Sequence, residues 1–597
     1  MGQITGAVIA TTLVTVACYI PLVFYGGMVG KMYIQFAFTM CVALSLSTCV
    51  ALTLSPVLCS LVLRAPGKPS RLFAPVNLAI DGSRKVYLAV AGLLVRRGLV
   101  TALLFAAACA GVWFAKDMPK ETLLPDEDKG NITIDVELAQ GATLKRTNQV
   151  LEDLSARIKD IPGIAGIMLM SGSGAMSGSG ENCGQGMVAL DHWDMRRTPD
   201  KSVNAIIAEI MRRTAGVHAA RIRCFTSPPI MGLGRVGGVG FNLCSDAGAT
   251  SAELAATAEK FARQVSALPE AAMVMNTFRA DTPQLRLTLD RRKAEILGVS
   301  PSAVFAMLQN KLASVYVNDF TLGGSAYEVI VQSEGSYRAS VEDVADLHVT
   351  TASGASVPLS AIANIAYEVG PKQVTRFDKM PSASLNAQAA PGVAGLTLIK
   401  AIEKLAPPEG YHIEWSEMSR QEKENEGRLG FLMGMAALFA YLFLVAQYES
   451  WTVPLSVMCS ILFALGGAYV GLWITGTPMS IYAQLGMVML IGLSAKNAIL
   501  MVEFSKQEHE AGLSVTDAAI KGADLRFRAV QMTAWSFLCG VLPLVLATGA
   551  GAGSQKAIGI STFSGMLAAT FVGSCFTPGL YAIFQRFREL VRKPSHP

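Results

Sequence analysis

A single lysine lies near the middle of a long apolar segment of this sequence. Residues 485–504 read LGMVMLIGLSAKNAILMVEF, with Lys496 close to the centre and Asn497 beside it. A lysine at the centre of a membrane span costs about 2.5–3.5 kcal/mol on insertion scales, so its ammonium must pair with an acid or face water. Phe504 follows about eight residues later, roughly 12 Å of helix, which is too far for the side chain to reach the membrane surface. We therefore interpret Lys496 as a functional ionisable group.

The partner of Lys496 should be a carboxylate at a similar depth in the membrane. The other apolar segments hold none, because Glu449 and Glu503 lie at segment ends. An acid that holds the ammonium while ionised and releases it when protonated is a physical basis for proton-coupled movement. We expect this acid to lie on helices outside the sequence.

Two further groups could serve the same proton relay. Arg526 and Arg528 lie at the start of the next apolar segment, and Thr533 follows Arg526 by seven residues, which places both on one face of a helix. Ordinary anchoring of arginines on the cytoplasmic side explains the two arginines equally well. For Thr533 taken alone, helix packing is the simpler explanation.

The elements that must position these groups are membrane helices. Of the 597 residues, 51% are hydrophobic and only 16% are charged, against about 25% in soluble proteins. The apolar residues form blocks long enough to cross a hydrocarbon core of about 30 Å. We expect eight spans, at residues 7–24, 34–63, 98–114, 429–446, 453–474, 481–504, 529–546 and 557–584.

Basic residues orient these spans, because short cytoplasmic loops are enriched in lysine and arginine. They gather after the second span and in the tail: Arg64, Lys68, Arg71, Arg84, Lys85, Arg96 and Arg97, then Arg586, Arg588, Arg592 and Lys593. Both termini are therefore expected in the cytoplasm. The predicted order is two membrane helices in 1–63, a cytoplasmic connection with an interfacial helix in 64–97, a membrane helix in 98–114, a large outward-facing region in 115–428, five membrane helices in 429–585 and a basic tail in 586–597.

The region 115–428 alternates strands and helices. One cycle comprises a strand at 132–138, a helix at 143–161 and a strand at 164–170; a second comprises strands at 239–243, 273–278 and 284–289 with helices at 251–268 and 301–312. This rhythm is typical of ferredoxin-like βαβ units, an α+β fold. Between the cycles, SGSGAMSGSG at 171–180 predicts a flexible loop, which is either an inert linker or a mobile gate.

The first two and the last two spans resemble each other. Pro21 and Pro543 are 522 residues apart, as are Pro56 and Pro578, each pair in a similar apolar context. Repeated halves are common in transporters. The last pair follows four other spans, so we expect four spans to be missing before the first pair.

Several motifs together resemble the resistance-nodulation-division (RND) superfamily. GLSAKNAIL at 492–500, LRFR at 525–528 and TGAGAGSQ at 548–555 are similar to its general motifs; LLPDEDKG at 123–130, YVNDF at 316–320, QAAPG at 388–392 and QYESW at 447–451 resemble its hydrophobe/amphiphile efflux branch. The resemblance covers nearly the whole chain, as the C-terminal part of a multidrug efflux permease.

The resemblance implies a homotrimeric pump of the bacterial inner membrane that exports small amphiphilic compounds by proton antiport. It implies a membrane helical bundle with a periplasmic insert of porter and docking subdomains in 115–428. The expected partners are a periplasmic adaptor protein, an outer-membrane channel and the lipid bilayer, without nucleic acid. The proton motive force drives transport, so no cofactor, metal ion or enzymatic site is expected.

The resemblance also assigns residues by motif. The proton relay comprises Lys496, Asn497, Arg526 and Thr533; the docking hairpin, which continues to about Glu328, comprises Tyr316, Val317, Asn318, Asp319 and Phe320; the substrate pocket and switch loop comprise Leu169, Ser171, Gly174, Met176, Met187, Phe225 and Arg279. Multidrug members hold several phenylalanines in this pocket, whereas only Phe225 keeps an aromatic ring here. Fewer rings mean less stacking with aromatic drugs. Ala529 also replaces the proline that usually follows Arg528.

Two alternatives remain beside the efflux function. One is an RND-related protein-export accessory or lipid handler, against which the docking and pocket motifs argue. The other is a truncated, non-functional pump fragment, because Met1 aligns inside the family's sequence. The six histidines are scattered, and the sequence shows no nucleotide-binding loop or nucleophile triad.

Overall fold

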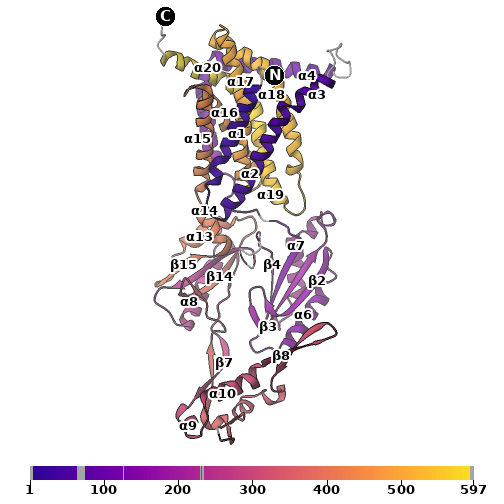
Figure 1. Cartoon of the computed structure of the whole chain (residues 1–597), viewed down its shortest axis with the longest axis vertical. Helices are drawn as coiled ribbons and strands as arrows, with labels where there is room; N and C mark the ends of the chain where they lie inside the picture. The colour runs from indigo at the N-terminus through magenta and orange to yellow at the C-terminus, as the bar shows by residue number, and fades with distance from the viewer. Residues whose placement is uncertain are drawn as a thin grey trace.

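The computed structural model of the chain describes residues 5–62, 74–125, 127–228, 230, 234, 236–351 and 353–591. Figure 1 shows a helical bundle at one end of the long axis and a set of α/β subdomains at the other. The first and the last helices both belong to the bundle. Five of the basic residues that oriented the predicted spans, Arg64, Lys68, Arg71, Arg592 and Lys593, lie outside the described residues.

The bundle is built from long apolar helices. They are α1 (Thr5–Val23), α2 (Gly27–Leu52), α3 (Leu54–Val62), α5 (Gly98–Ala115), α15 (Arg428–Tyr448), α16 (Val453–Thr475), α17 (Ile481–Glu510), α18 (Val515–Val545), α19 (Ala552–Ala568), the π-helical turn η6 (Ala569–Gly573) and α20 (Ser574–Val591). Within the described chain, seven segments are long and apolar enough to cross a membrane; α2 with α3, and α19 with α20, each count as one. The first predicted span is a shorter apolar helix, Val8–Val23. Since a span needs about 20 residues, the total of eight stays a prediction.

Helix α17, which carries Lys496, lies at the centre of the bundle. It packs against α1, α16, α18 and α19. Its apolar window is the most buried of the seven candidate spans in the described chain. The helices approach closely at glycines, since a Cβ atom built on Gly467 of α16 would lie 2.4 Å from Cβ of Ala568 on α19. Small residues at such crossings are the usual means of tight packing in membranes.

In the described part of the predicted connection 64–97, residues 74–96 form the helix α4 (Ala74–Arg96). It lies at the end of the bundle away from the α/β subdomains (Figure 1). Arg84 binds Asp524 of α18 through two hydrogen bonds of 2.6 and 2.7 Å. This bidentate pair attaches α4 to the bundle.

The first α/β unit is a four-stranded antiparallel sheet covered by two helices. Its elements are β1 (Asn131–Leu138), α6 (Leu144–Ile158), β2 (Ile164–Gly174), β3 (Gly178–Leu190), α7 (Val203–Thr214) and β4 (Ala220–Thr226), with the short 3-10 turns η2 (Trp193–Met195) and η3 (Pro199–Lys201) before α7. The strand order is β2-β3-β1-β4, which is the ferredoxin-like arrangement. Ile132, Ile134 and Val136 of β1 are fully buried against α6 and α7.

The second unit has the same arrangement but is interrupted. Its elements are β5 (Val239–Ser245), α8 (Ser251–Ser266), β6 (Ala271–Asn276), β13 (Arg376–Phe377), β14 (Met380–Ala389), α13 (Gly395–Lys404) and β15 (Tyr411–Trp415). Strands β13-β14-β5-β15 form one sheet, and β6 pairs with β14. Helix α14 (Glu417–Asn425) then leads into α15.

The interruption corrects the continuous second cycle expected from the sequence. Strand β7 (Thr282–Leu289) pairs with β12 (Ala363–Gly370) and not with β6. Helix α10 (Pro301–Leu308) belongs to the same insert, which lies farthest from the bundle (Figure 1). Its other elements are α9 (Arg291–Ile296), η4 (Gln309–Ala313), β8 (Val315–Leu322), β9 (Ser325–Val331), η5 (Gly335–Tyr337), α11 (Val341–Ala345), β10 (His348–Thr350), β11 (Ser356–Pro358) and α12 (Leu359–Ile362). Local periodicity does not reveal which sheet a strand joins, because pairing depends on distant partners.

Candidate functional site

Lys496 lies on a side of α17 that the described helices leave open. It is exposed, whereas its neighbours Ala495 and Ala498 are buried. Among the described residues, no carboxylate lies within 4.0 Å of its ammonium. Within the described chain, the Lys496 side chain therefore lies on the flank of the bundle without an acidic partner.

The other predicted relay residues lie on α17 and α18, which pack against each other. The Arg526 guanidinium lies 3.6 Å from the centre of the Phe504 ring, a cation–π contact. Helices α17 and α18 run antiparallel. Thr533 lies seven residues after Arg526, and Asn497 lies seven residues before Phe504. Thr533 and Asn497 are therefore at about the same height on the two helices. Thr533 is exposed, and its hydroxyl donates to the Val530 carbonyl at 2.9 Å. The two helices thus bring Thr533 to the depth of Lys496 and Asn497, with Arg526 about two helical turns away, and no direct hydrogen bond joins these residues in the described structure.

Asn497 turns toward a small polar cavity inside the bundle. The cavity has a volume of about 10 Å³, and its lining includes Asn497, Ser460, Ser494, Ser574 and Thr577. The Asn497 amide nitrogen is buried without a hydrogen-bond partner among the described residues. A space of this size is at the lower limit for one water molecule.

The N-terminus of α17 is bonded to the linker between α5 and β1. The Met479 N–H donates to the Lys120 carbonyl at 2.7 Å, and the Ile481 N–H donates to the Leu123 carbonyl at 3.0 Å. The Thr122 N–H donates to the Met479 carbonyl at 3.1 Å. These three backbone bonds join the lysine-bearing helix to the chain that enters the first α/β unit.

Two glutamates strengthen this junction. Glu422 of α14 accepts hydrogen bonds from the Leu123 N–H at 3.0 Å and the Thr122 hydroxyl at 3.3 Å. Glu127 accepts the Ser554 N–H at 2.9 Å and its hydroxyl, at the start of α19. An acid at a helix N-terminus satisfies free N–H groups and complements the helix dipole. The sequence interpretation missed both glutamates, since only the fold brings their partners near.

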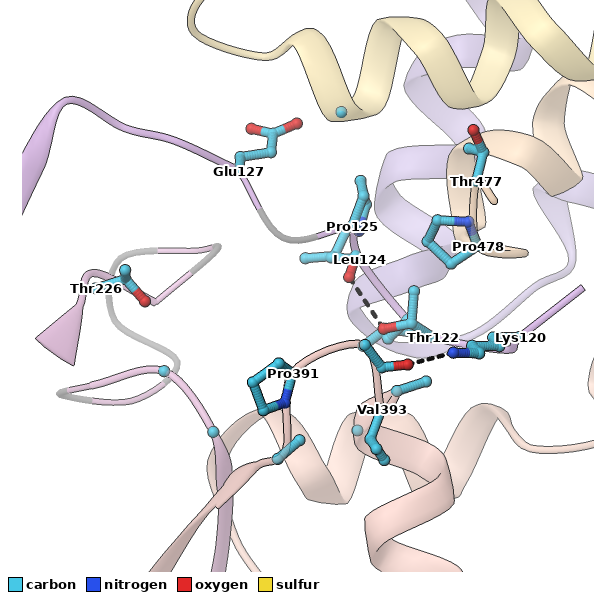
Figure 2. Close-up of a pocket in the computed structure, with 18 of the residues that line it drawn as sticks. Lys120, Thr122, Leu124, Pro125, Glu127, Thr226, Pro391, Val393, Thr477 and Pro478 are labelled. Atoms are coloured by element: carbon cyan, nitrogen blue, oxygen red, sulfur yellow. Dashed lines mark hydrogen bonds between the residues drawn. The ribbon is translucent and has the colours of Figure 1, made fainter. Parts of the chain in front are cut away.

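Figure 2 shows a cavity of about 1280 Å³ at the same junction. It lies between the linker, the α16–α17 loop, the start of α19 and both α/β units. Its lining is rich in proline and carries charges at the rim, including Pro125, Pro391, Pro478, Glu127 and Lys120. The Lys120 ammonium donates to the Gly392 carbonyl on one wall (Figure 2). Ligand pockets commonly measure about 300–1,000 Å³, so this cavity is larger than most of them.

The predicted substrate-pocket residues lie elsewhere. Leu169 packs on the core of the first unit, whereas Met187 is exposed. Leu169 pairs with Gly186 and Met168 with Met187, so Leu169 and Met187 are on opposite faces of the sheet because strand side chains alternate. These two residues therefore do not share one wall, and none of the seven predicted pocket residues lines the 1280 Å³ cavity.

Most of the glycine–serine segment 171–180 lies in two paired strands, which corrects the expected loop. Strands β2 and β3 extend through it and leave a turn at residues 175–177. Met176 packs with Phe225, Val236 and Met275. A Cβ atom on Gly174 would lie 2.6 Å from a carboxylate oxygen of Asp135, so the turn requires glycine there. Ser171 is half-buried in β2.

Arg279 lies in the segment that follows β6. Its Nε donates to Asp281 at 3.0 Å, and this hydrogen bond lowers the pKa of the Asp281 carboxyl. Its Nη1 also lies 3.6 Å from Glu137 of β1. Arg279 therefore reaches from the second unit to the first.

The predicted docking residues form an exposed hairpin of β8 and β9. Tyr316, Val317 and Phe320 are exposed apolar residues. Phe320 stacks on Tyr327 with ring centres 5.6 Å apart. The side chain of Asn318 accepts the Asp319 N–H at 2.9 Å. A projecting arm with this much apolar surface is typical of an interaction site.

The fold and these sites define a class: a multi-pass membrane protein with an extramembranous α/β region and a lysine on the flank of its helical bundle. In the described part of the chain, no group of three or more histidine, cysteine, aspartate or glutamate side chains is arranged to hold a metal ion. The chain belongs to the AcrB/AcrD/AcrF family, whose model matches residues 1–585. This is a family of RND efflux transporters, so the resemblance noted in the sequence is confirmed.

Curated relatives match nearly the whole chain. The multidrug export protein AcrF of Escherichia coli is 31% identical over 98% of this chain. The toluene efflux pump membrane transporter TtgE of Pseudomonas putida is 31% identical over 100% of it, and the solvent-resistant pump membrane transporter SrpB of the same species is 32% identical over 100%. The chain spans 58% of the length of each of these three relatives.

Proposed function

We propose that this chain contributes to a proton-driven RND transporter that exports hydrophobic or amphiphilic compounds from the periplasm and inner membrane. The observation that best supports this proposal is the position of Lys496. It presents its charge on the bundle flank, and the first residue of its helix is bonded to the porter linker at 3.0 Å. A change in the charge that faces Lys496 would shift α17, and α17 would move the linker with it.

The 1280 Å³ cavity supports a small, apolar or amphiphilic substrate. Its walls mix prolines and Trp473 with charged groups, and apolar walls with a few polar groups suit amphiphiles. The names of TtgE and SrpB point to toluene and solvents as the cargo of those relatives. Substrates of that kind are the first to test here.

The proposed assembly is a homotrimer that works with a periplasmic adaptor protein and an outer-membrane channel. The β8–β9 hairpin supports it, because its apolar side chains have no partner surface in the described part of the chain. Neighbouring subunits would cover Tyr316, Val317 and Phe320. The expected location is the bacterial inner membrane, with both ends of the chain in the cytoplasm.

The experiment that tests the transport function compares two lysines of one helix. The pump is expressed as its gene encodes it, with its adaptor, in a bacterium that lacks its own efflux pumps. Lys496→Ala is expected to abolish proton-dependent export of toluene-like solvents. Lys506→Ala, near the end of α17 where the ammonium lies 3.9 Å from Glu510, is expected to retain it. Equal export by wild type and Lys496→Ala, at equal protein levels, would refute the proposal.

A further inference from the structure

A carboxylate is fully buried in the first α/β unit, on the face of β1 away from the apolar core. The side chain of Asp135 has 0% exposure. Ile134 and Val136 on either side of it point into the core, so Asp135 points toward the β2–β3 hairpin, because strand side chains alternate. A buried charge is costly unless it is paired and hydrogen-bonded.

One oxygen of Asp135 is used entirely by the turn of the hairpin. Asp135 Oδ1 accepts the Met176 N–H at 2.9 Å, the Ser177 N–H at 3.3 Å and the Ser177 hydroxyl at 3.1 Å. Hydrogen bonds to an ionised acceptor are about twice as strong as neutral ones. The turn, residues 175–177, is thereby attached to the neighbouring strand.

The other oxygen of Asp135 begins a chain of ion pairs that crosses to the second unit. Asp135 Oδ2 lies 3.4 Å from Nη1 of Arg223 on β4, and Nη2 of that arginine lies 3.3 Å from Glu137. Glu137 in turn lies 3.6 Å from Arg279, which follows β6 of the second unit. Asp135 is thus the point where the turn and the inter-unit ion pairs meet.

The apolar contacts of the turn lie at the same boundary. Met176 packs against Phe225 of the first unit and Met275 of the second. The base of the hairpin is held by the β2–β3 ladder, whose register shifts between Ser171 and Ser173. Gly172 and Gly178 next to the turn have positive φ values of +87° and +78°, which glycine adopts without strain. The ladder thus holds the base of the hairpin, while Asp135 and the contacts of Met176 hold the turn.

We propose that Asp135 is a positioning residue that holds the turn 175–177 closed against the boundary between the two α/β units. Closure requires the carboxylate, since the turn at Met176 and Ser177 binds one of its oxygens and Arg223 binds the other. This inference rests on the proposed function, in which movement between the two units accompanies transport. A separation of the units breaks the Glu137–Arg279 contact and takes Met275 away from Met176, so the turn loses part of its support when the units part.

Hydrogen–deuterium exchange of the full chain in detergent tests this inference. In Asp135→Ala, a peptide covering 171–180 is expected to exchange at least about tenfold faster, as the loss of hydrogen bonds to a charged group predicts. Ser177→Ala removes one of the three bonds and should produce a smaller rise. Asp153→Ala, an exposed aspartate of α6 paired with Arg157 at 2.9 Å, should leave the peptide unchanged.

A second variant distinguishes a local effect on the turn from general unfolding. Asp135→Asn keeps the shape and one acceptor oxygen but loses the charge, and it should accelerate exchange of 171–180 while peptides of β1 and β4 stay protected. Unchanged exchange of 171–180 in Asp135→Asn and Asp135→Ala would overturn the inference. So would an equal loss of protection throughout the sheet in both variants. Exchange is measured without transport, so failure here leaves the Lys496 experiment to decide the proposed function separately.

Discussion

The backbone N–H of Ile481 donates a hydrogen bond of 3.0 Å to the carbonyl of Leu123. Ile481 is the first residue of α17, and the first four N–H groups of a helix have no partner within it. The linker to the α/β region supplies one. The helix that carries Lys496 and the chain that enters the first α/β unit therefore meet at a buried hydrogen bond, beside the 1280 Å³ cavity.

Glu422 should stabilise this junction more than other glutamates of α14. Glu422→Ala leaves the Leu123 N–H, which Glu422 binds at 3.0 Å, without this acceptor. When a buried donor loses its acceptor, the free energy of unfolding falls by about 1–3 kcal/mol. The expected results are a lower thermal midpoint and faster hydrogen exchange of the linker 118–125.

The matched control is Glu424→Ala on the same helix. Glu424 pairs with Arg420 at 2.9 Å on the surface, and such pairs contribute about 0–1 kcal/mol. Equal effects of the two variants on linker exchange would contradict the role of Glu422.

Gly467 should be required for the packing of α16 on α19. In Gly467→Ala the new Cβ would lie 2.4 Å from Ala568 Cβ and 2.7 Å from the Ser564 carbonyl, so the helices must move apart. Overpacking of this kind costs about 1–3 kcal/mol, and thermal unfolding in detergent should show the loss. Gly434→Ala, in open space on α15, should be neutral or slightly stabilising. Wild-type stability of Gly467→Ala would show that the crossing is looser than described.

Cys224 should resist alkylation in the folded protein. Burial raises its pKa to about 12, and the thiolate is the reactive form. At pH 8 the thiolate fraction, and with it the rate of maleimide labelling, should be lower than for a free thiol by about a thousandfold. Mass spectrometry after labelling measures this, with urea-unfolded protein as the fast reference. Equal rates of maleimide labelling in the folded and unfolded states would rule out the raised pKa of Cys224.

The stability of helix α7 should depend on acid pH through Glu209. Hydrogen bonds from Arg212 and then Arg213 lower the pKa of Glu209 from 4.5 to about 2. Because the folded pKa lies below the unfolded one, the ionised glutamate stabilises the fold above about pH 4.5. That contribution disappears as the pH falls toward about 2.

Glu209→Gln should therefore unfold at a lower temperature than wild type at pH 7, by a small amount because the pairs are exposed. The difference should vanish toward pH 2. Glu152→Gln, an exposed glutamate of α6, is the control. A difference that persists at low pH would mean that the substitution acts through something other than ionisation.

Local pattern was enough to predict the long apolar helices and some elements of the α/β region, but not elements such as β3, α7, β14 and β15. The span predicted at 481–504 lies within α17 (Ile481–Glu510), and the strand at 132–138 differs from β1 (Asn131–Leu138) by one residue. Apolar length and alternating polarity determine such elements directly. The segment 171–180 was misread because its glycines and serines suggest disorder by composition, whereas β-pairing and Asp135 order it.

The sequence by itself determined the class of this protein. Apolar blocks, a lysine within one of them and a few motifs are properties of contiguous residues, and they sufficed to identify the RND family. Only the tertiary structure decided which distant groups meet: Ile481 with Leu123, Glu422 with the linker, Asp135 with Met176, and β7 with β12 and not β6. These contacts join residues dozens to hundreds of positions apart. Chain periodicity carries no information about such pairings, since they arise when whole elements pack.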